Sequence, residues 1–430
     1  MPYKSGYCSW IGVFLNQNKI QTYAVKILKQ VLLERRNLTD VFACVFFENS
    51  LKEIPVIKDI SYGVLRYYKL LDYWVNCYLK TTLKEIEIYL LLLVALYQLN
   101  YTRAAEYAVV NEAVNLAAKK YQGKYKKLVN AVLRNHLRGR PNNLLIPNDN
   151  IEALYNLPHW WVNKIINDYP GQSIDIFSAY QTHPPLTLRV NARKIETSDY
   201  LNILREESIE AVQWDQFAIC LIKPIPVTKI PYFFDGYVSV QDWGAQQAVP
   251  LLEVTDDAYV LDACAAPGGK TGHLLEYANC ELLALDISLE RLKKVEDNLK
   301  RLNLSAQLKC ADAGKLETWW DGRYFDYILA DIPCTASGVV KRNPDIKWLR
   351  QLADANNMAK SHEKLIDNLW KCLRSQGKML IATCSIFREE NQDQILKFLS
   401  RNPDASLMQQ LQILPNKDKD GFYYALVKKD

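Results

Sequence analysis

Two cysteines stand directly after segments that we predict to be buried strands. Cys334 follows Asp331 and Pro333, and Cys384 follows Thr383. A lone cysteine more often belongs to a hydrophobic core than to a reactive site. Two cysteines at strand ends, one of them close to an aspartate and a proline, favour a site where a thiolate acts as a nucleophile.

A glycine-containing turn follows another predicted strand. Its sequence at 264–271 is Cys-Ala-Ala-Pro-Gly-Gly-Lys-Thr. Gly268 and Gly269 allow the backbone to turn sharply and to approach a ligand closely where a helix begins, which predicts a nucleotide pocket. The phosphate-binding loop of NTPases needs a glycine five positions before Gly269, where Cys264 stands. The turn therefore argues against an NTPase, and it lacks the G-x-G-x-x-G dinucleotide fingerprint.

Two aspartates end later strands. Asp286 lies about 20 positions beyond the glycine turn, where a carboxylate can bind both ribose hydroxyls of an adenosine. Ser288 and Glu290 follow it, so capping of the next helix is the alternative interpretation of Asp286. Asp312 ends the next strand, where its carboxylate could accept a hydrogen bond from an adenine amino group.

Strands and helices alternate from Tyr237 onward. The predicted strands cover 258–263, 281–285, 327–330 and 378–383. Such alternation predicts a mostly parallel, Rossmann-like sheet with helices on both faces. Ligands of these sheets bind outside the carboxyl ends of the strands, which is where the cysteines and aspartates stand.

The N-terminal part has a different pattern. Residues 20–138 show helical periodicity with almost no turn signals, and 139–143 read as a linker. Prolines punctuate 151–235, and Leu186 to Val190 alternates as a strand does. The predicted fold is multidomain: an all-helical domain at 19–140, a linker and small α+β domain at 141–236, and a Rossmann-like domain at 237–430.

Positive charge is concentrated at one end of the chain. Residues 1–150 contain 21 Lys and Arg against 11 Asp and Glu, a net +10, so the other 280 residues carry −5 of the overall +5. Between Lys119 and Arg140 basic residues occur with no acidic one, interleaved with Tyr121, Tyr125 and His136. Such a run is usually a solvated helix face, but the absence of carboxylates favours a phosphate-contacting surface. The candidates are Lys119, Lys120, Lys124, Lys126, Lys127, Arg134 and Arg138.

Length and composition exclude several protein classes. A chain of 430 residues exceeds one core, and 49% apolar with 23% charged residues excludes a disordered or collagen-like protein. The apolar run Ile88 to Tyr97 is short of the roughly 20 residues that cross a bilayer, and it reads as a buried helix. Polar residues at 16–19 interrupt any signal-peptide core, and ten cysteines fit neither a disulfide framework nor a zinc site. We expect a soluble cytoplasmic protein without a metal.

Three motifs, in this order, resemble those of the RNA cytosine-C5 methyltransferases. They are Ala-Ala-Pro-Gly-Gly-Lys-Thr at 265–271, Asp-Ile-Pro-Cys-Thr-Ala-Ser-Gly at 331–338 and Ala-Thr-Cys-Ser at 382–385. The segments 240–242, 342–348 and 420–425 look like the bacterial 16S ribosomal RNA branch of that family, called RsmB, Sun or Fmu. That branch has a helical N-terminal domain similar to the antitermination factor NusB, in agreement with the helical pattern here. About 18 N-terminal residues do not match and are given no role.

The resemblance implies a covalent mechanism with S-adenosylmethionine as cofactor. Cys384 would bond to C6 of cytosine, so that C5 can attack the sulfonium methyl, and Cys334 would assist release of the C5 proton. Asp331 would hold the cytosine edge, supported by Lys270. DNA enzymes use the Pro-Cys position as nucleophile, so a functional cysteine at 384 favours RNA. The implied cofactor-binding residues are Cys264, Ala265, Ala266, Pro267, Gly268, Gly269, Lys270, Asp286, Asp312 and Asp331.

The function that the resemblance implies is 5-methylcytidine formation at position 967 of 16S ribosomal RNA, before the 30S subunit is fully assembled. The catalytic motifs do not specify which nucleotide is methylated, so a position in transfer RNA or another ribosomal position is an alternative. A non-catalytic RNA-binding assembly factor is the alternative from another class. Against it, every expected site residue is present.

Overall fold

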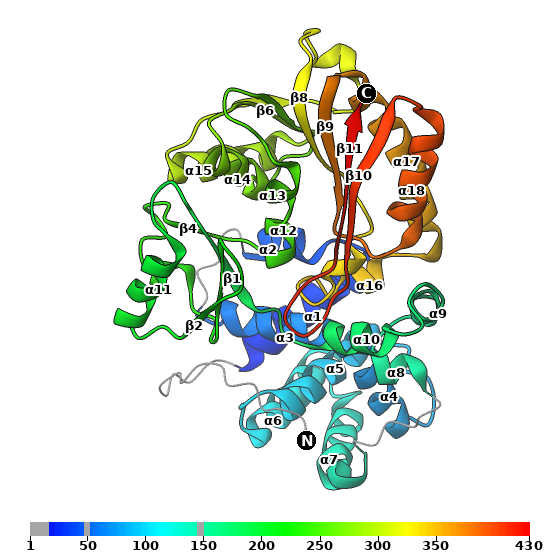
Figure 1. Ribbon diagram of the computed structural model, residues 1–430. Coiled ribbons are helices and arrows are strands. Elements are labelled where there is room, and N and C mark those ends of the chain that lie inside the picture. Colours follow the sequence, from blue (N-terminus) through cyan, green and yellow to red (C-terminus); the bar gives the residue numbers. More distant parts are fainter. Residues whose placement is uncertain (1–16, 47–51, 144–149) are drawn as a thin grey trace. The chain divides into compact units, whose positions relative to one another are not determined.

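The computed structural model describes residues 17–46, 52–143 and 150–430. They form two compact units (Figure 1). The helical unit comprises the residues up to Gln181 together with Val340–Gln351, and the α/β unit comprises Thr182–Val339 and Leu352–Asp430. None of the helices within the described ranges is long and apolar enough to cross a membrane.

The helical unit is built around α5, whose side chains from Leu90 to Leu99 are all buried. A helix that is apolar on every side must lie inside a protein, as predicted for this run. The helices are α1 (Gln17–Leu32), α2 (Leu38–Phe46), α3 (Ile54–Arg66), α4 (Tyr68–Tyr78), α5 (Ile86–Tyr101), α6 (Glu106–Lys120), α7 (Lys126–Asn143), α8 (Ile151–Tyr155), α9 (His159–Asp168), α10 (Ser173–Gln181) and α16 (Ile346–Leu349).

Helix α7 runs through the segment that we predicted as a linker. It continues to Asn143, although Gly139 and Pro141 were interpreted as a break. A proline removes one backbone donor, so near a helix end it costs a single hydrogen bond rather than the whole helix. The predicted break at 139–143 is therefore wrong for these residues.

A segment of the C-terminal half belongs to the helical unit. Residues 340–351 include α16, and Trp348 donates its indole N–H to the Leu65 carbonyl at 2.8 Å. The Asp345 carboxylate accepts the backbone N–H of Leu38 at 3.0 Å. The prediction placed this segment in the C-terminal domain at 237–430, and it did not foresee that the segment packs with the helical unit.

A small antiparallel sheet opens the α/β unit. Its strand order is β2-β3-β1-β4, and Leu188 and Ile219 pack with Tyr200 and Leu204 of α11 in its core. The elements are β1 (Leu186–Val190), α11 (Thr197–Glu206), β2 (Ala211–Gln213), β3 (Ala218–Leu221), the 3-10 turn η1 (Val227–Lys229) and β4 (Val238–Val240).

The second sheet of the α/β unit has seven strands in the order β10-β11-β9-β8-β5-β6-β7. Strands β9, β8, β5, β6 and β7 run parallel to one another. Strand β11 pairs antiparallel with β9, and β10 pairs antiparallel with β11. The strands are β5 (Tyr259–Asp262), β6 (Glu281–Asp286), β7 (Gln307–Cys310), β8 (Phe325–Asp331), β9 (Leu373–Thr383), β10 (Ala405–Ile413) and β11 (Phe422–Lys429).

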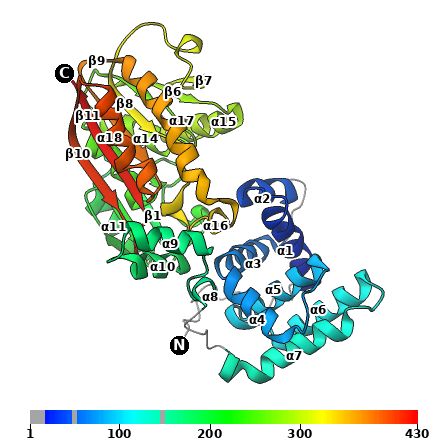
Figure 2. The same ribbon diagram turned by 90° about the vertical axis from the view of Figure 1, so that its right-hand side faces the viewer.

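Helices cover both faces of this sheet, as the alternation predicted (Figures 1 and 2). Leu252, Leu274 and Val295 bring α13, α14 and α15 into one buried cluster, while Ile366 and Phe398 bring α17 and α18 into another. The bounds are α12 (Trp243–Gln246), α13 (Ala248–Leu252), α14 (Gly269–Tyr277), α15 (Leu289–Leu302), α17 (Leu352–Lys371) and α18 (Gln392–Arg401), with 3-10 turns η2 (Leu316–Thr318), η3 (Ser337–Val339) and η4 (Arg388–Glu390).

Candidate functional site

The glycine turn joins β5 to α14 at the carboxyl edge of the sheet. Gly268 has a φ of 95°, a conformation that strains other residues, and a Cβ there would lie only 3.0 Å from the Val295 Cα, so both features favour glycine. The Ala265 N–H donates to the Leu285 carbonyl at 2.8 Å, which ties the turn to the end of β6. The predicted turn therefore lies against the predicted ribose-binding strand.

Asp286 ends β6 and is bonded to that turn. Its Oδ2 accepts the Ala266 N–H at 3.2 Å, and its Oδ1 accepts the Ser288 N–H at 2.9 Å. Ser288, not Asp286, caps α15, because its hydroxyl accepts the Arg291 N–H at 3.3 Å. The helix-cap alternative for Asp286 is thus not what the structure shows.

Asp312 follows β7, the strand beside β6. Its Oδ1 accepts the Gly314 N–H at 3.0 Å, and its side chain is 42% exposed. Register pairing places Asp286 opposite Cys310, two residues before Asp312. The two aspartates therefore stand at the ends of neighbouring parallel strands.

The two predicted chemical cysteines are brought together. Their Sγ atoms lie 3.5 Å apart, one at the end of β8 and one at the end of β9. Cys334 is buried and Cys384 is half-buried. The pKa of the Cys334 thiol is raised well above its usual value, first by its hydrogen bond with Cys384 and then by burial. Cys334 is consequently a protonated thiol at neutral pH.

Lys270 and Asp331 form an ion pair beside these thiols. The Lys270 ammonium lies 2.5 Å from Asp331 Oδ2. Burial acts to lower the pKa of Lys270, but the Asp331 carboxylate outweighs it and the pKa is raised. The neighbouring Cys384 is a smaller cause of the same rise in the pKa of Lys270. The pair supplies a fixed carboxylate and a fixed cation at the strand ends.

Some residues that hold this site were missed from the sequence. Asp262 ends β5, and its Oδ2 accepts the Thr271 hydroxyl at 2.8 Å. Burial, ahead of all other causes, raises the pKa of Asp262 to about 7. Arg189 of β1 is fully buried, forms two hydrogen bonds of 2.8 Å to Glu276, and donates to the Gly269 carbonyl at 2.7 Å. Both residues fix the start of α14.

The seven basic candidates lie in α6, α7 and the turn between them, and all are exposed. Lys120 forms an ion pair with Glu87 of α5, an acidic neighbour that the local sequence did not reveal. His136 is buried, and Tyr121 and Tyr125 are half-buried, so the interleaved aromatics belong mainly to the core side. The cations are thus available to a ligand, with one partly neutralised.

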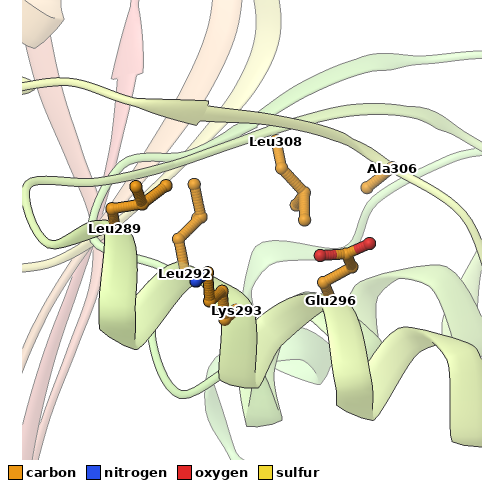
Figure 3. Close-up of a pocket in the computed structure, with 6 residues that line it drawn as sticks. All are labelled: Leu289, Leu292, Lys293, Glu296, Ala306 and Leu308. Carbon is orange, nitrogen blue, oxygen red and sulfur yellow. The ribbon is translucent and has the colours of Figure 1, made fainter.

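A hollow between α15 and β7 does not include the predicted site residues (Figure 3). It is lined by Leu289, Leu292, Lys293, Glu296, Ala306 and Leu308. Within the described ranges, no cluster of three or more His, Cys, Asp or Glu could hold a metal ion.

Comparison with known proteins decides the family. Residues 249–428 match the family described as 16S rRNA methyltransferase RsmB/F. Ribosomal RNA small subunit methyltransferase B of Serratia proteamaculans is 37% identical over 96% of this chain and 99% of its own length. The chain belongs to the RsmB/F methyltransferase family. The protein of the same name from Yersinia enterocolitica is 37% identical over 96% of this chain and 100% of its own length.

The remaining matches cover the other parts of this RsmB/F family member. Residues 18–138 match the NusB family, and 157–228 match the ferredoxin-like domain of RsmF/B-like methyltransferases. The crystal structure of PH0851 shares the fold over 97% of this chain and 100% of its own, with a TM-score of 0.78 and 22% identity. A methyltransferase homologue from Pyrococcus horikoshii covers 65% of this chain and 97% of its own, with a TM-score of 0.58 and 23% identity.

The predicted fold class is therefore confirmed, with a NusB-like helical domain, a small α+β domain and a Rossmann-like methyltransferase domain. The protein is an RNA methyltransferase that uses S-adenosylmethionine.

Proposed function

We propose that this enzyme methylates C5 of cytosine 967 in 16S ribosomal RNA through a covalent cysteine adduct. The observation that carries the proposal is the 3.5 Å approach of two thiols at the ends of β8 and β9, beside the Lys270–Asp331 pair. The curated relatives are named for the small-subunit ribosomal RNA, which supports that substrate. The address within the RNA rests on the family resemblance.

Cys384 is the proposed nucleophile. C5 of cytosine is a poor nucleophile, and addition of the Cys384 thiolate at C6 places electron density on C5. S-adenosylmethionine supplies the methyl group, which is electrophilic because it is bonded to a sulfonium sulfur. Asp331 holds the cytosine edge and favours protonation at N3, which accepts electrons during addition, and Lys270 holds Asp331 in place.

Cys334 is the proposed base for the second half of the reaction. The C5 proton must leave before the C6–sulfur bond can break and the Cys384 thiolate can be expelled. Cys384 itself raises the pKa of Cys334 through their hydrogen bond and its charge. Once Cys384 is bonded to carbon, both contributions fall away and the pKa of Cys334 decreases. The thiolate form of Cys334 therefore becomes easier to reach at the step in which the C5 proton leaves.

Cofactor binding is assigned to the glycine turn and the two strand-end aspartates. Asp286 accepts hydrogen bonds from the ribose hydroxyls, and Asp312 accepts one from the adenine amino group. The turn residues assigned to the cofactor site are Cys264, Ala265, Ala266, Pro267, Gly268, Gly269 and Lys270. Asp331 is assigned to the end of the site where the methyl group is transferred. The bonds between Asp286 and the turn support this assignment, since they fix the carboxylate before the cofactor arrives.

Replacement of Asp286 tests the cofactor site. We expect Asp286→Ala to weaken S-adenosylmethionine binding by about 10-fold or more, because it removes hydrogen bonds to a charged acceptor. Isothermal titration calorimetry without RNA measures the affinity. Asp297→Ala, on the exposed face of α15, is the matched control and should bind as the wild type does. An unchanged affinity in Asp286→Ala would exclude this residue from the site.

The exposed cations of α6 and α7 are proposed to bind RNA phosphates. They supply affinity without specificity, while the target cytosine must be unstacked to reach the thiols. We place the reaction in the cytoplasm, on 16S ribosomal RNA before the 30S subunit is fully assembled, and with no metal. All seven side chains are exposed, as contact with phosphates requires.

Charge reversal tests this surface. Lys124, Lys126 and Lys127 changed together to Glu should weaken RNA binding and flatten its dependence on salt, because fewer counterions are released. Cofactor affinity should not change. Filter binding at several salt concentrations measures both the affinity and the slope. If neither moves, the run is a solvated helix face.

Methylation of defined RNA tests the whole proposal. Purified enzyme and tritiated S-adenosylmethionine should label 16S ribosomal RNA, and a cytosine-to-uridine change at position 967 should abolish labelling. Labelling of transfer RNA, or of the altered 16S RNA at the wild-type level, would overturn the address. No labelling of any RNA under conditions where cofactor binds would favour a non-catalytic assembly factor.

A further inference from the structure

A buried carboxylate joins the two cysteine loops. Glu390 ends η4 and is 1% exposed. Its Oε1 accepts the backbone N–H of Thr335 at 2.7 Å, and its Oε2 accepts the hydroxyls of Thr335 and Ser385 at 2.5 Å each. Thr335 follows Cys334, and Ser385 follows Cys384. One carboxylate therefore bonds to the residue next to each thiol.

Hydroxyl groups extend this connection between the loops. The hydroxyls of Ser337 and Ser385 lie 2.9 Å apart, and the Ser337 oxygen accepts the Ile386 N–H at 2.8 Å. The Gly338 N–H donates to the Cys384 carbonyl at the same distance. A buried charge is costly unless donors surround it, and Glu390 has three. These bonds fix one loop against the other.

The two loops depend on Glu390 unequally. Asn391 also holds the Cys384 loop, since its Nδ2 donates to the Ser385 carbonyl at 2.8 Å and its Oδ1 accepts the Thr383 hydroxyl at 2.6 Å. On the Cys334 loop, His362 contacts the carbonyl of Pro333, the residue before the cysteine. Glu390 forms both of its bonds to this loop with Thr335, the residue after the cysteine. The bonds of Ser337 and Gly338 hold this loop only three and four residues beyond the thiol. Loss of Glu390 should therefore displace Cys334 more than Cys384.

We propose that Glu390 is a positioning residue that holds the Cys334 thiol in place for removal of the C5 proton. This inference rests on the covalent mechanism proposed above. It assigns to Glu390 no contact with the RNA or the cofactor. Its effect should therefore appear in the step that Cys334 performs, and not in cofactor binding.

The test uses the full-length enzyme with labelled 16S ribosomal RNA and S-adenosylmethionine on a denaturing gel. Glu390→Ala should reduce turnover by about 10- to 100-fold, the scale expected when a reacting group is misplaced, and should accumulate protein–RNA adduct. Its S-adenosylmethionine affinity should stay close to that of the wild type, while its melting temperature should fall by a few degrees because buried donors lose their acceptor. Glu390→Gln should recover most of the turnover, because its amide can accept from Thr335 N–H and donate to both hydroxyls.

Two further variants make the result specific. Glu281→Ala is the matched control, since Glu281 is exposed and begins β6 at the opposite end of the strand from the site. In a Cys334→Ala background, adding Glu390→Ala should cause no further rise in adduct. Independent effects in that double variant would overturn the positioning role. If Glu390→Ala does not fold, Thr335→Val removes one of its hydrogen bonds and should accumulate adduct in the same way.

The same gel separates this inference from the mechanism beneath it. Wild-type turnover in Glu390→Ala, with no adduct in Cys384→Ala, overturns the role of Glu390 alone. An adduct that persists in Cys384→Ala overturns the proposed covalent assignment and the role of Glu390 with it.

Discussion

Cys384→Ala should abolish methylation and remove every covalent protein–RNA adduct. Without a bond to C6, no electron density reaches C5, and the ring cannot attack the methyl group. We expect the rate to fall by a factor on the order of 10⁴ or more, as when a covalent nucleophile is lost. Transfer of a tritiated methyl group measures the rate, and a denaturing gel with labelled RNA measures the adduct.

The control for this variant is another buried thiol. Cys372 lies just before β9, at the opposite end of the strand from Cys384, and packs in the core. Cys372→Ala should methylate at nearly the wild-type rate. Cofactor affinity should be unchanged in both variants, so that a loss confined to Cys384→Ala reports chemistry. Substantial methylation by Cys384→Ala would refute the assignment of the nucleophile.

The placement of the site could be predicted because parallel sheets bring strand ends to one edge. Cys334, Cys384 and Asp286 were each located after a predicted strand, and their strands lie in one sheet. What the sequence did not predict is the strand order. The adjacency of β8 and β9, which creates the 3.5 Å approach of the thiols, depends on connections that periodicity does not encode.

Buried charges were the main omission. Arg189 lies in a predicted strand whose residues alternate in polarity. Its partner Glu276 lies 87 positions later, too far for a local pattern to pair them. Glu390 follows Arg388 and Glu389 and looks like a solvated helix start. Only the folded chain shows that it accepts three hydrogen bonds between the cysteine loops. A single sequence cannot distinguish such a carboxylate from its exposed neighbours.

The last two strands were also absent from the predicted sheet. Strand β10 is fully buried only at Ile413, because it forms one edge of the sheet, so its sequence has no clear apolar alternation. The segment 340–351 was included in the C-terminal domain because it is continuous with it in sequence. Its burial in the helical unit depends on contacts with Leu38 and Leu65, about 300 residues earlier.

Cys334→Ala should differ from Cys384→Ala in kind. Addition at C6 and methyl transfer should still occur, because Cys384 is intact. Removal of the C5 proton should fail, so an adduct that survives denaturation should accumulate with methylated RNA attached. We expect most of the RNA in a single-turnover reaction to remain bound, whereas the wild type retains little.

The pH dependence of adduct decay tests the assigned base directly. In the adduct the contributions of Cys384 are lost, but burial still raises the pKa of Cys334, so its base form becomes more abundant as the pH increases. Adduct decay in the wild type should therefore accelerate from neutral to alkaline pH. In Cys334→Ala the decay should be slow at every pH, because the titrating group is absent. A Cys334→Ala adduct that decays at the wild-type rate would refute Cys334 as the base. An adduct found only in Cys384→Ala would reverse the roles of the two thiols.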